Sequence, residues 1–268
     1  MKARAGGALV ALGFWLLLAT TAVAGPPSAD PGWVELIGPN GLDGWRKPTA
    51  AWFEAADARP DQKDPSRLAA TPGRGIIVNG LDGKTRNLLS KEDYGDVEVR
   101  LEFLIPKGSN SGIKLEGLYE VQIADRRESG KLTGSDCGGV YPRAELFPRY
   151  HHLDDGHAPA ENAARPAGEW QSLSLRFLAP RFDARGRKVA NARLRDVVLN
   201  GRTIHADLEL KAPTGHAWRL PEVPRGPILL QGDHGPVAFR KLRVRPIDEP
   251  AQRTSARTGS QSGGRTVE

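Results

Sequence analysis

Apolar and polar residues alternate along most of this chain in short runs that end at Gly, Pro, Asn or Asp. The clearest run is 97–105, where every second residue is apolar and Glu98, Arg100 and Glu102 lie between them. The run 171–178 repeats the pattern. A period of two residues is typical of a strand with one buried face. Between residues 33 and 248 no long stretch shows the period of a helix.

The same reasoning predicts strands along most of the chain. The predicted ranges are 34–37, 75–78, 88–90, 97–105, 112–116, 119–125, 138–141, 171–178, 190–199, 204–210, 228–231 and 237–246. Asn200-Gly201 predicts a two-residue hairpin turn, because such turns need positive φ at both central residues. Many short strands with few helices predict an all-β fold, a two-sheet antiparallel β-sandwich. The segments 57–72 and 143–168 are predicted to be long irregular loops.

Residues 1–24 have the composition of an export signal peptide. Lys2 and Arg4 form a basic start, residues 8–19 are an apolar run, and Ala22-Val23-Ala24 is a small-x-small cleavage site. Cleavage after Ala24 would make the protein exported, periplasmic or extracellular, with no stable membrane insertion. The alternative is an uncleaved membrane anchor, because the length of the apolar run is ambiguous. Gly25 follows the expected cut in place of Cys, which argues against a lipid anchor.

The rest of the chain divides into a linker at 25–32, one domain at 33–248 and a tail at 249–268 that is expected to be disordered. Cys137 is the only cysteine, so no intrachain disulfide can form and the fold depends on its core. The formal net charge of +6 falls to +4 without Lys2 and Arg4, and the Arg residues are scattered. No nucleic-acid partner is therefore expected.

The segment 108–125 carries the most informative pattern. Its two predicted strands place one set of residues on an apolar face and another on a polar face. The apolar set is Ile113, Leu115, Tyr119, Val121 and Ile123; the polar set is Lys114, Glu116, Glu120 and Gln122. Glu120 and Gln122 lie two residues apart on one strand, about 7 Å along the same face. A carboxylate and an amide in this arrangement suit the binding of a polyhydroxylated ligand.

Several motifs in order resemble the 3-keto-disaccharide hydrolase family, and together they cover about residues 33–247. They include Tyr-Glu-Val-Gln-Ile-Ala-Asp at 119–125 and Gln-Gly-Asp-His-Gly-Pro at 231–236. The other matching segments are 33–38, 41–45, 88–96, 109–113, 138–141 and 166–171. The resemblance implies a concanavalin A-like jelly roll, export, and action on glycosides oxidised at C3. The segments 57–72 and 150–157 match no motif of the family.

A 3-keto sugar allows a particular route to glycoside cleavage. The carbonyl acidifies the C2 proton, so a base can remove it and the C1 substituent leaves by β-elimination; water then adds to the enone. This route needs a base, a group that stabilises the enolate oxygen and an acid for the leaving group. We assign Glu120 or His234 as the base and Asp125 as its partner or as the acid. The expected substrate-binding residues are Lys114, Gln122, Asn110, Gln231 and Tyr141.

Each of these residues also has a structural explanation. Glu120 and Gln122 are also consistent with a solvated strand face, Asp125 with a turn cap, and His234 with a residue that only shapes a tight loop. The cluster of His151, His152, Asp154, Asp155 and His157 has no spacing that matches a known ligand motif, so no metal and no cofactor is expected. The expected partner is a carbohydrate. The main alternative function is a non-catalytic carbohydrate-binding jelly-roll module of the cell envelope, and the oligomeric state is left open.

Overall fold

A computed structural model describes residues 32–39, 41–46, 51–80, 82–125 and 130–247. In chain order its elements are β1 (Val34–Glu35), β2 (Phe53–Pro60), β3 (Leu68–Val78), β4 (Leu88–Tyr94), β5 (Val97–Leu104), β6 (Asn110–Leu115), β7 (Tyr119–Ala124), β8 (Ala144–Glu145), β9 (His151–His152), β10 (Gln171–Leu178), β11 (Arg181–Phe182), β12 (Lys188–Ala190), β13 (Ala192–Leu199), β14 (Arg202–Leu210), the 3₁₀ helix η1 (His216–Arg219), β15 (Gly226–Leu230) and β16 (Ala238–Pro246). The predicted all-β fold class is confirmed.

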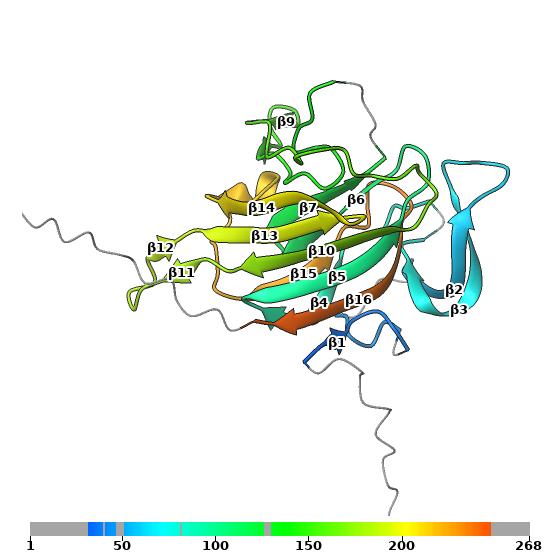
Figure 1. Ribbon diagram of the computed structural model, residues 1–268, viewed down its shortest axis with the longest axis horizontal. Helices are drawn as coiled ribbons and strands as arrows, with labels where there is room; N and C mark the ends of the chain where they lie inside the picture. The colour runs from blue at the N-terminus through cyan, green and yellow to red at the C-terminus, as the bar shows by residue number, and fades with distance from the viewer. Residues whose placement is uncertain (1–31, 40, 47–50, 81, 126–129, 248–268) are drawn as a thin grey trace, which may run out of the picture. The chain divides into compact units, whose positions relative to one another are not determined.

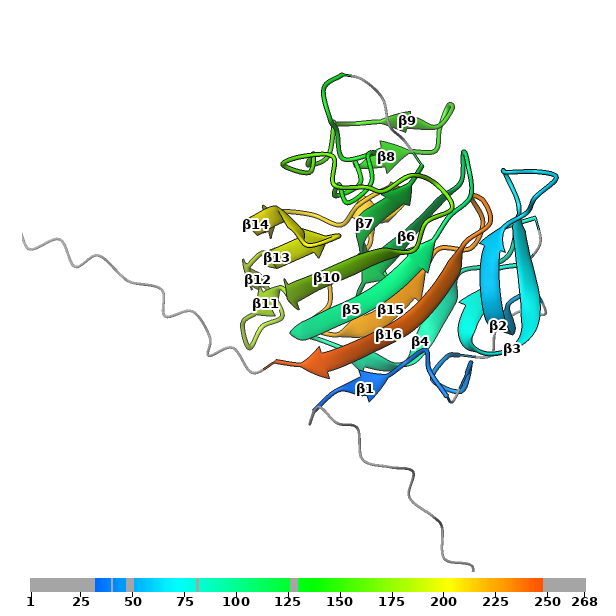
Figure 2. The ribbon, with the colours of Figure 1, turned by 45° about the vertical axis from the view of Figure 1, so that its right-hand side comes forward.

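Two antiparallel sheets are stacked face to face (Figures 1 and 2). The larger sheet has the order β14-β13-β10-β5-β16-β3-β2, with β1 added along β16. The smaller sheet has the order β4-β15-β6-β7. Strands distant in sequence are neighbours in both sheets, as the pair β5–β16 and the pair β6–β15 show. This is the two-sheet antiparallel sandwich that the strand pattern predicted, and it is consistent with the jelly roll that the family resemblance implied.

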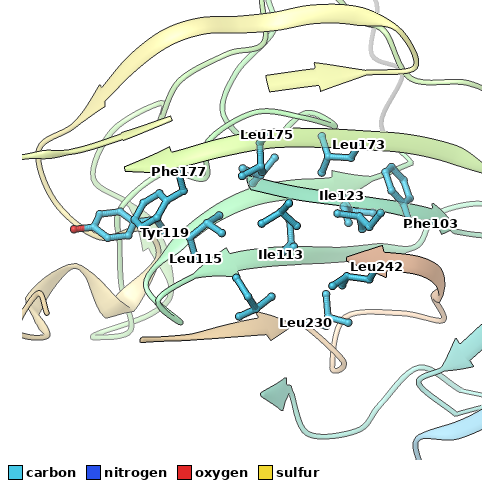
Figure 3. Packing of buried hydrophobic residues seen from close by; sticks show 14 of the residues in the cluster. Phe103, Ile113, Leu115, Tyr119, Ile123, Leu173, Leu175, Phe177, Leu230 and Leu242 are labelled. Carbon is cyan, nitrogen blue, oxygen red and sulfur yellow. The ribbon is translucent and has the colours of Figure 1, made fainter. Parts of the chain in front are cut away.

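The core lies between the two sheets. Ile113 and Leu115 of the smaller sheet face Leu175 and Phe177 of the larger one (Figure 3), and each of the four is at most 1% exposed. Burying one such side chain stabilises the fold by about 1.5–3 kcal/mol. The alternation seen in the sequence therefore reports which face of each strand meets the other sheet.

The turn predicted at Asn200-Gly201 joins β13 to β14, and both residues have positive φ, 51° and 81°. The prediction for 57–72 was wrong, because this segment belongs to the hairpin of β2 and β3. Its apolar packing residues are Ala58, Leu68 and Ala70, and two of the three are small, so the apolar period was too weak to detect. The predicted strand 138–141 contributes only isolated bridges, from Val140 to Val121 and from Val140 to His157. The segment 143–168 is mostly irregular and contains the short pair β8–β9.

The export signal, most of the linker and the tail lie outside the described residues, so these expectations stay predictions. Within the described part of the chain, no helix has the length and apolar character needed to cross a membrane.

One buried side chain organises the loop between β15 and β16. The Asn79 amide donates to the carbonyl oxygens of Gly232 and Gly235, at 2.9 and 2.8 Å, and its carbonyl oxygen accepts from the Val237 backbone at 2.8 Å. Asn79 is fully buried. These bonds hold the loop that carries Asp233 and His234 against the end of β3 in the larger sheet.

We predict that Asn79→Ala lowers the free energy of unfolding by about 2–4 kcal/mol, because it leaves two carbonyl groups and one backbone N–H without their partner. Urea unfolding followed by circular dichroism measures this change. The control is Asn162→Ala at an exposed position, which should change stability by less than about 1 kcal/mol. Equal effects of the two substitutions would contradict the anchoring role of Asn79.

Candidate active site

The outer face of the smaller sheet carries the polar residues predicted from the sequence. In the β6–β7 pair, Lys114 lies opposite Glu120 and Gly112 lies opposite Gln122. Gln231 follows β15, and its backbone N–H donates to the Gly112 carbonyl oxygen at 2.9 Å. Because side chains alternate between faces of a strand, these residues project to the side away from the core. Three neighbouring strands thus bring Lys114, Glu120, Gln122 and Gln231 together, as predicted.

Lys114 and Glu120 form an ion pair in which Nζ lies 3.0 Å from Oε2. The Lys114 side chain is 10% exposed and the Glu120 side chain 3% exposed. The carboxylate lies over Gly112 on the adjacent strand: a Cβ atom at position 112 would be 2.4 Å from Glu120 Oε1. A glycine is therefore required beside Glu120 for the carboxylate to occupy this position.

Two glutamine side chains flank the same glycine with their acceptors unused. The Oε1 atoms of Gln122 and Gln231 are buried and have no hydrogen-bond partner within the described part of the protein. Buried polar atoms are nearly always hydrogen-bonded, so an orphaned pair needs an explanation. Acceptors next to an ion pair match the hydroxyl donors of a sugar.

The outer edge of β7 is occupied by two other segments. The Tyr141 N–H donates to the Glu120 carbonyl oxygen at 3.1 Å, and the Glu120 N–H donates to Thr214 Oγ1 at 3.0 Å. The antiparallel bridge between Val121 and Val140 places Tyr141 beside Glu120 on the polar face. Tyr141, predicted to bind substrate, is therefore part of this face.

The Tyr141 hydroxyl joins a small polar cluster. Its oxygen lies 2.9 Å from the Tyr150 hydroxyl and 3.1 Å from His152 Nε2. Burial and the hydrogen bond with Tyr141 raise the pKa of Tyr150 above its ordinary value, and the charge of Glu120 adds to this effect. Tyr150 and His152 were not among the predicted site residues. The only signal in the sequence was the His-rich segment 150–157, which matched no motif.

The other predicted residues lie at the far end of the same sheet. Asn110 is four residues before Lys114, about 13 Å along the strand. The loop with His234 reaches this end, since Ser109 Oγ donates to the Pro236 carbonyl oxygen at 2.6 Å. His234 Nδ1 lies 2.6 Å from Asp233 Oδ1, and the His234 side chain is 54% exposed. Asn110 and His234 are thus placed apart from the Lys114–Glu120 pair.

Asp125 has a turn contact in the structure. Its Oδ2 atom accepts a hydrogen bond from the Gly108 backbone at 2.8 Å, and its own backbone N–H donates to the Ser109 carbonyl oxygen at 3.0 Å. These contacts close the turn before β6. These contacts give Asp125 a structural role in the turn. Its role as an acid stays a prediction.

Glu116 does not lie on the polar face, where the alternation in the sequence predicted it. Its φ of 55° takes it out of the strand, so it does not share the face of Lys114. It is 5% exposed, and neither carboxyl oxygen has a hydrogen-bond partner in the described structure. Burial raises its pKa to about 8, and the charges of Glu222 and Asp96 add to this effect while Arg181 opposes it. The alternation rule failed here because the strand ends at Leu115.

The His-rich segment does not assemble a metal site in the described part of the chain, where no three His, Cys, Asp or Glu side chains converge. Asp154 pairs with Arg143 at 2.7 Å, and Asp155 lies 3.7 Å from Lys131. His151 Nδ1 lies 2.9 Å from the Arg149 carbonyl oxygen. These residues shape the loop that presents Tyr150 and His152.

Two cavities lie away from the ion pair. One of about 330 Å³ lies beyond the edge of β7 and shares Tyr141 with the polar face. The other, of about 540 Å³, lies on the outer face of the larger sheet and is lined by residues such as Arg100, Ser172 and Lys241. Neither is lined by Lys114 or Glu120. Volume alone therefore does not identify the site; the chemistry of the side chains does.

Comparisons with known proteins agree with this architecture. The family described as 3-keto-alpha-glucoside-1,2-lyase-like domain matches residues 32–245, which confirms the resemblance seen in the sequence. No curated protein matches the chain. A solved structure of a candidate glycosyl hydrolase from Parabacteroides distasonis ATCC 8503 is 22% identical, with a TM-score of 0.56; the match covers 81% of this chain and 84% of the other. A second one from that organism is 20% identical, with a TM-score of 0.52, and covers 80% and 99%. At these identities the two structures show a shared fold.

We predict that Gly112→Ala displaces the Glu120 carboxylate, because the new methyl group would occupy its position. The fold should survive, since the clash is with the end of a side chain and the backbone of Gly112 is compatible with alanine. The variant should lose at least about tenfold in any activity of the polar face, with a melting temperature within a few degrees of the wild type. A crystal structure of the variant with Glu120 unmoved would contradict this prediction.

We predict a pH dependence of stability from Glu116. An acid whose pKa is raised by folding holds its proton more tightly in the folded state, so its contribution is fully present below the ordinary value of 4.5 and is lost as the pH rises through about 8. The free energy of unfolding should therefore fall by about 2–4 kcal/mol between pH 5 and pH 9 relative to Glu116→Gln. Urea unfolding of both proteins at each pH isolates this residue from His205 and other titrating groups. The prediction would be contradicted if the free energies of unfolding of the wild type and of Glu116→Gln changed with pH by the same amount.

Proposed function

We propose that this protein cleaves 3-keto-glycosides, including 3-keto-disaccharides, by elimination across C1 and C2. The chain belongs to the 3-keto-alpha-glucoside-1,2-lyase-like family and is therefore a carbohydrate-processing enzyme. Hydration of the resulting enone would complete net hydrolysis. Export, with cleavage after Ala24 and a periplasmic or extracellular location, is part of the same proposal.

The Lys114–Glu120 ion pair is the observation that carries this proposal. Glu120 is the better placed of the two predicted bases, because a cation lies 3.0 Å from its carboxylate. When the carboxylate takes the C2 proton it becomes neutral, and negative charge develops on the C3 oxygen of the sugar. The Lys114 ammonium, released from its partner, can then stabilise the enolate. The net charge of the site stays constant during the step.

The surroundings of the pair favour this chemistry. Electrostatic interactions are stronger where water is excluded, and donors held in place before the reaction stabilise developing charge without reorganisation. Because both side chains are nearly buried, water competes weakly for Glu120 and Lys114. In this proposal the C2–C3 edge of the sugar is directed towards the pair.

The glutamines and the far end of the sheet supply substrate binding. Gln122 Oε1 and Gln231 Oε1 would accept hydrogen bonds from hydroxyl groups of the oxidised ring. Asn110 lies about 13 Å along the strand from Lys114, a distance that suits the second ring of a disaccharide, and the loop with His234 contacts the same end of β6. His234 is accordingly proposed to contact the distal sugar, and Tyr141 the ring at the ion pair.

A non-catalytic carbohydrate-binding module remains the second candidate, because the same sandwich supports binding without reaction. The burial of the Lys114–Glu120 pair is the observation that favours it, since a purely structural ion pair would also be enclosed. A module needs amides and neutral hydrogen bonds, whereas the elimination needs the Glu120 carboxylate. The two candidates differ in whether the bound sugar is consumed.

We predict that Glu120→Gln lowers kcat/KM on a 3-keto-disaccharide by about 10²–10⁴-fold, because the amide cannot accept the C2 proton. His234→Ala should instead raise KM for the disaccharide with little change for a methyl 3-keto-glucoside. Mass spectrometry of the products and absorbance of the enone follow the reaction, and deuterium at C2 should slow it. The control is Glu209→Gln on the exposed surface. Binding of the sugar without turnover by the wild-type protein would favour the module.

A further inference from the structure

Three side chains form a hydrogen-bonded chain beside the proposed reaction centre. Tyr150 Oη lies 2.9 Å from Tyr141 Oη, which lies 3.1 Å from His152 Nε2. The His152 ring stands edge-on to both phenol rings, with centroid distances of 5.3 Å to Tyr141 and 5.6 Å to Tyr150. The Tyr141 hydroxyl is thus the central member of the chain.

The chain lies at the surface beside the edge of β7, where Tyr150 is 50% exposed and Tyr141 is half-buried. Tyr141 donates its backbone N–H to the Glu120 carbonyl oxygen and is the neighbour of Glu120 on the polar face, so its hydroxyl brings Tyr150 and His152 to that side of the sheet. His152 is exposed. A proton entering at His152 has a continuous path of hydrogen-bonding atoms to Tyr150.

The fold orients His152 towards the phenols and His151 away from them. The two residues form β9, which pairs with β8 so that Ala144 lies opposite His152 and Glu145 opposite His151. Consecutive strand residues point to opposite sides. The Arg143–Asp154 ion pair at 2.7 Å and the hydrogen bond from the Leu153 N–H to the Arg143 carbonyl oxygen at 2.8 Å hold this short hairpin.

We infer that Tyr150, Tyr141 and His152 form the proton relay that protonates the leaving oxygen during cleavage of the glycosidic bond. This inference rests on the proposed function and takes the relay as the acid in place of Asp125, whose carboxylate accepts a hydrogen bond from the Gly108 backbone in the turn before β6. Tyr150 is the catalytic residue of the relay, since it touches the leaving oxygen, and His152 is a positioning and resupplying residue.

The electrons and protons of the step balance within these groups. The C2 proton moves to Glu120, and its bonding pair forms the enolate with the C3 carbonyl. Collapse of the enolate makes the C1–C2 double bond and breaks the C1–O bond, whose electron pair stays on the leaving oxygen. That oxygen takes the Tyr150 proton. Tyr150 regains a proton from Tyr141, Tyr141 from His152 Nε2, and His152 from solvent at Nδ1.

The test compares leaving groups of different basicity. A nitrophenolate leaves without protonation, whereas an alkoxide of a sugar or of methanol requires an acid. His152→Gln and Tyr150→Phe should therefore lower kcat/KM about 10²-fold for methyl 3-keto-glucoside and for a 3-keto-disaccharide, and less than about threefold for 4-nitrophenyl 3-keto-glucoside. His151→Gln, the matched control on the opposite side of β9, should leave all three substrates unchanged. Tyr141→Phe should behave like Tyr150→Phe.

Three outcomes would overturn the relay. Equal losses on the nitrophenyl and methyl substrates would indicate a structural role, and near-normal rates on both would exclude any role. His151→Gln matching His152→Gln would indicate that only the hairpin matters. Thermal unfolding by circular dichroism confirms that each variant is folded. A wild-type protein that cleaves none of the substrates would instead overturn the proposed function, and the relay with it.

Discussion

The Lys114–Glu120 ion pair is the interaction on which the site depends. Removing two charges from water is costly, and their attraction offsets this cost only when the geometry is good. Here the geometry comes from the β6–β7 register, which sets Lys114 opposite Glu120 and leaves Gly112 to make room for the carboxylate. A slip of one residue would turn Ile113 and Val121 outwards, so the core of the sandwich fixes the pair in place.

The remaining residues of the site lie along the outer edge of β7, which has no neighbouring strand of the smaller sheet. A sheet edge presents unpaired backbone groups that a protein must cover or use. The edge is occupied by Tyr141 and its neighbours and by Thr214, and these contacts bring the segment 143–157 next to Glu120. The loop that looked unrelated to the polar face in the sequence thus lies beside it. Its Tyr and His side chains supply hydroxyl and imidazole groups that the polar face of β6 and β7 lacks.

Individual residues show where sequence reasoning succeeded and where it failed. The alternation at 113–123 placed Lys114, Glu120 and Gln122 on one face, because strand parity follows from backbone geometry. It failed at Glu116, where a positive φ ends the strand, and at 57–72, where buried Ala residues gave no apolar period. Glu120 and His234 were both proposed as the base, yet the loop that carries His234 contacts Ser109, at the opposite end of β6 from Lys114.

The sequence by itself determined the all-β class, the apolar and polar faces of the strands, the hairpin at Asn200-Gly201 and membership of the family. These properties depend on local backbone preference and on a period of two, which a single chain displays directly. Only the tertiary structure decided that Glu120 pairs with Lys114 over Gly112, that two glutamine oxygens lack partners, and that Tyr150 and His152 meet Tyr141. Those contacts join segments far apart in the chain, and their distances follow from how the sheets and loops pack.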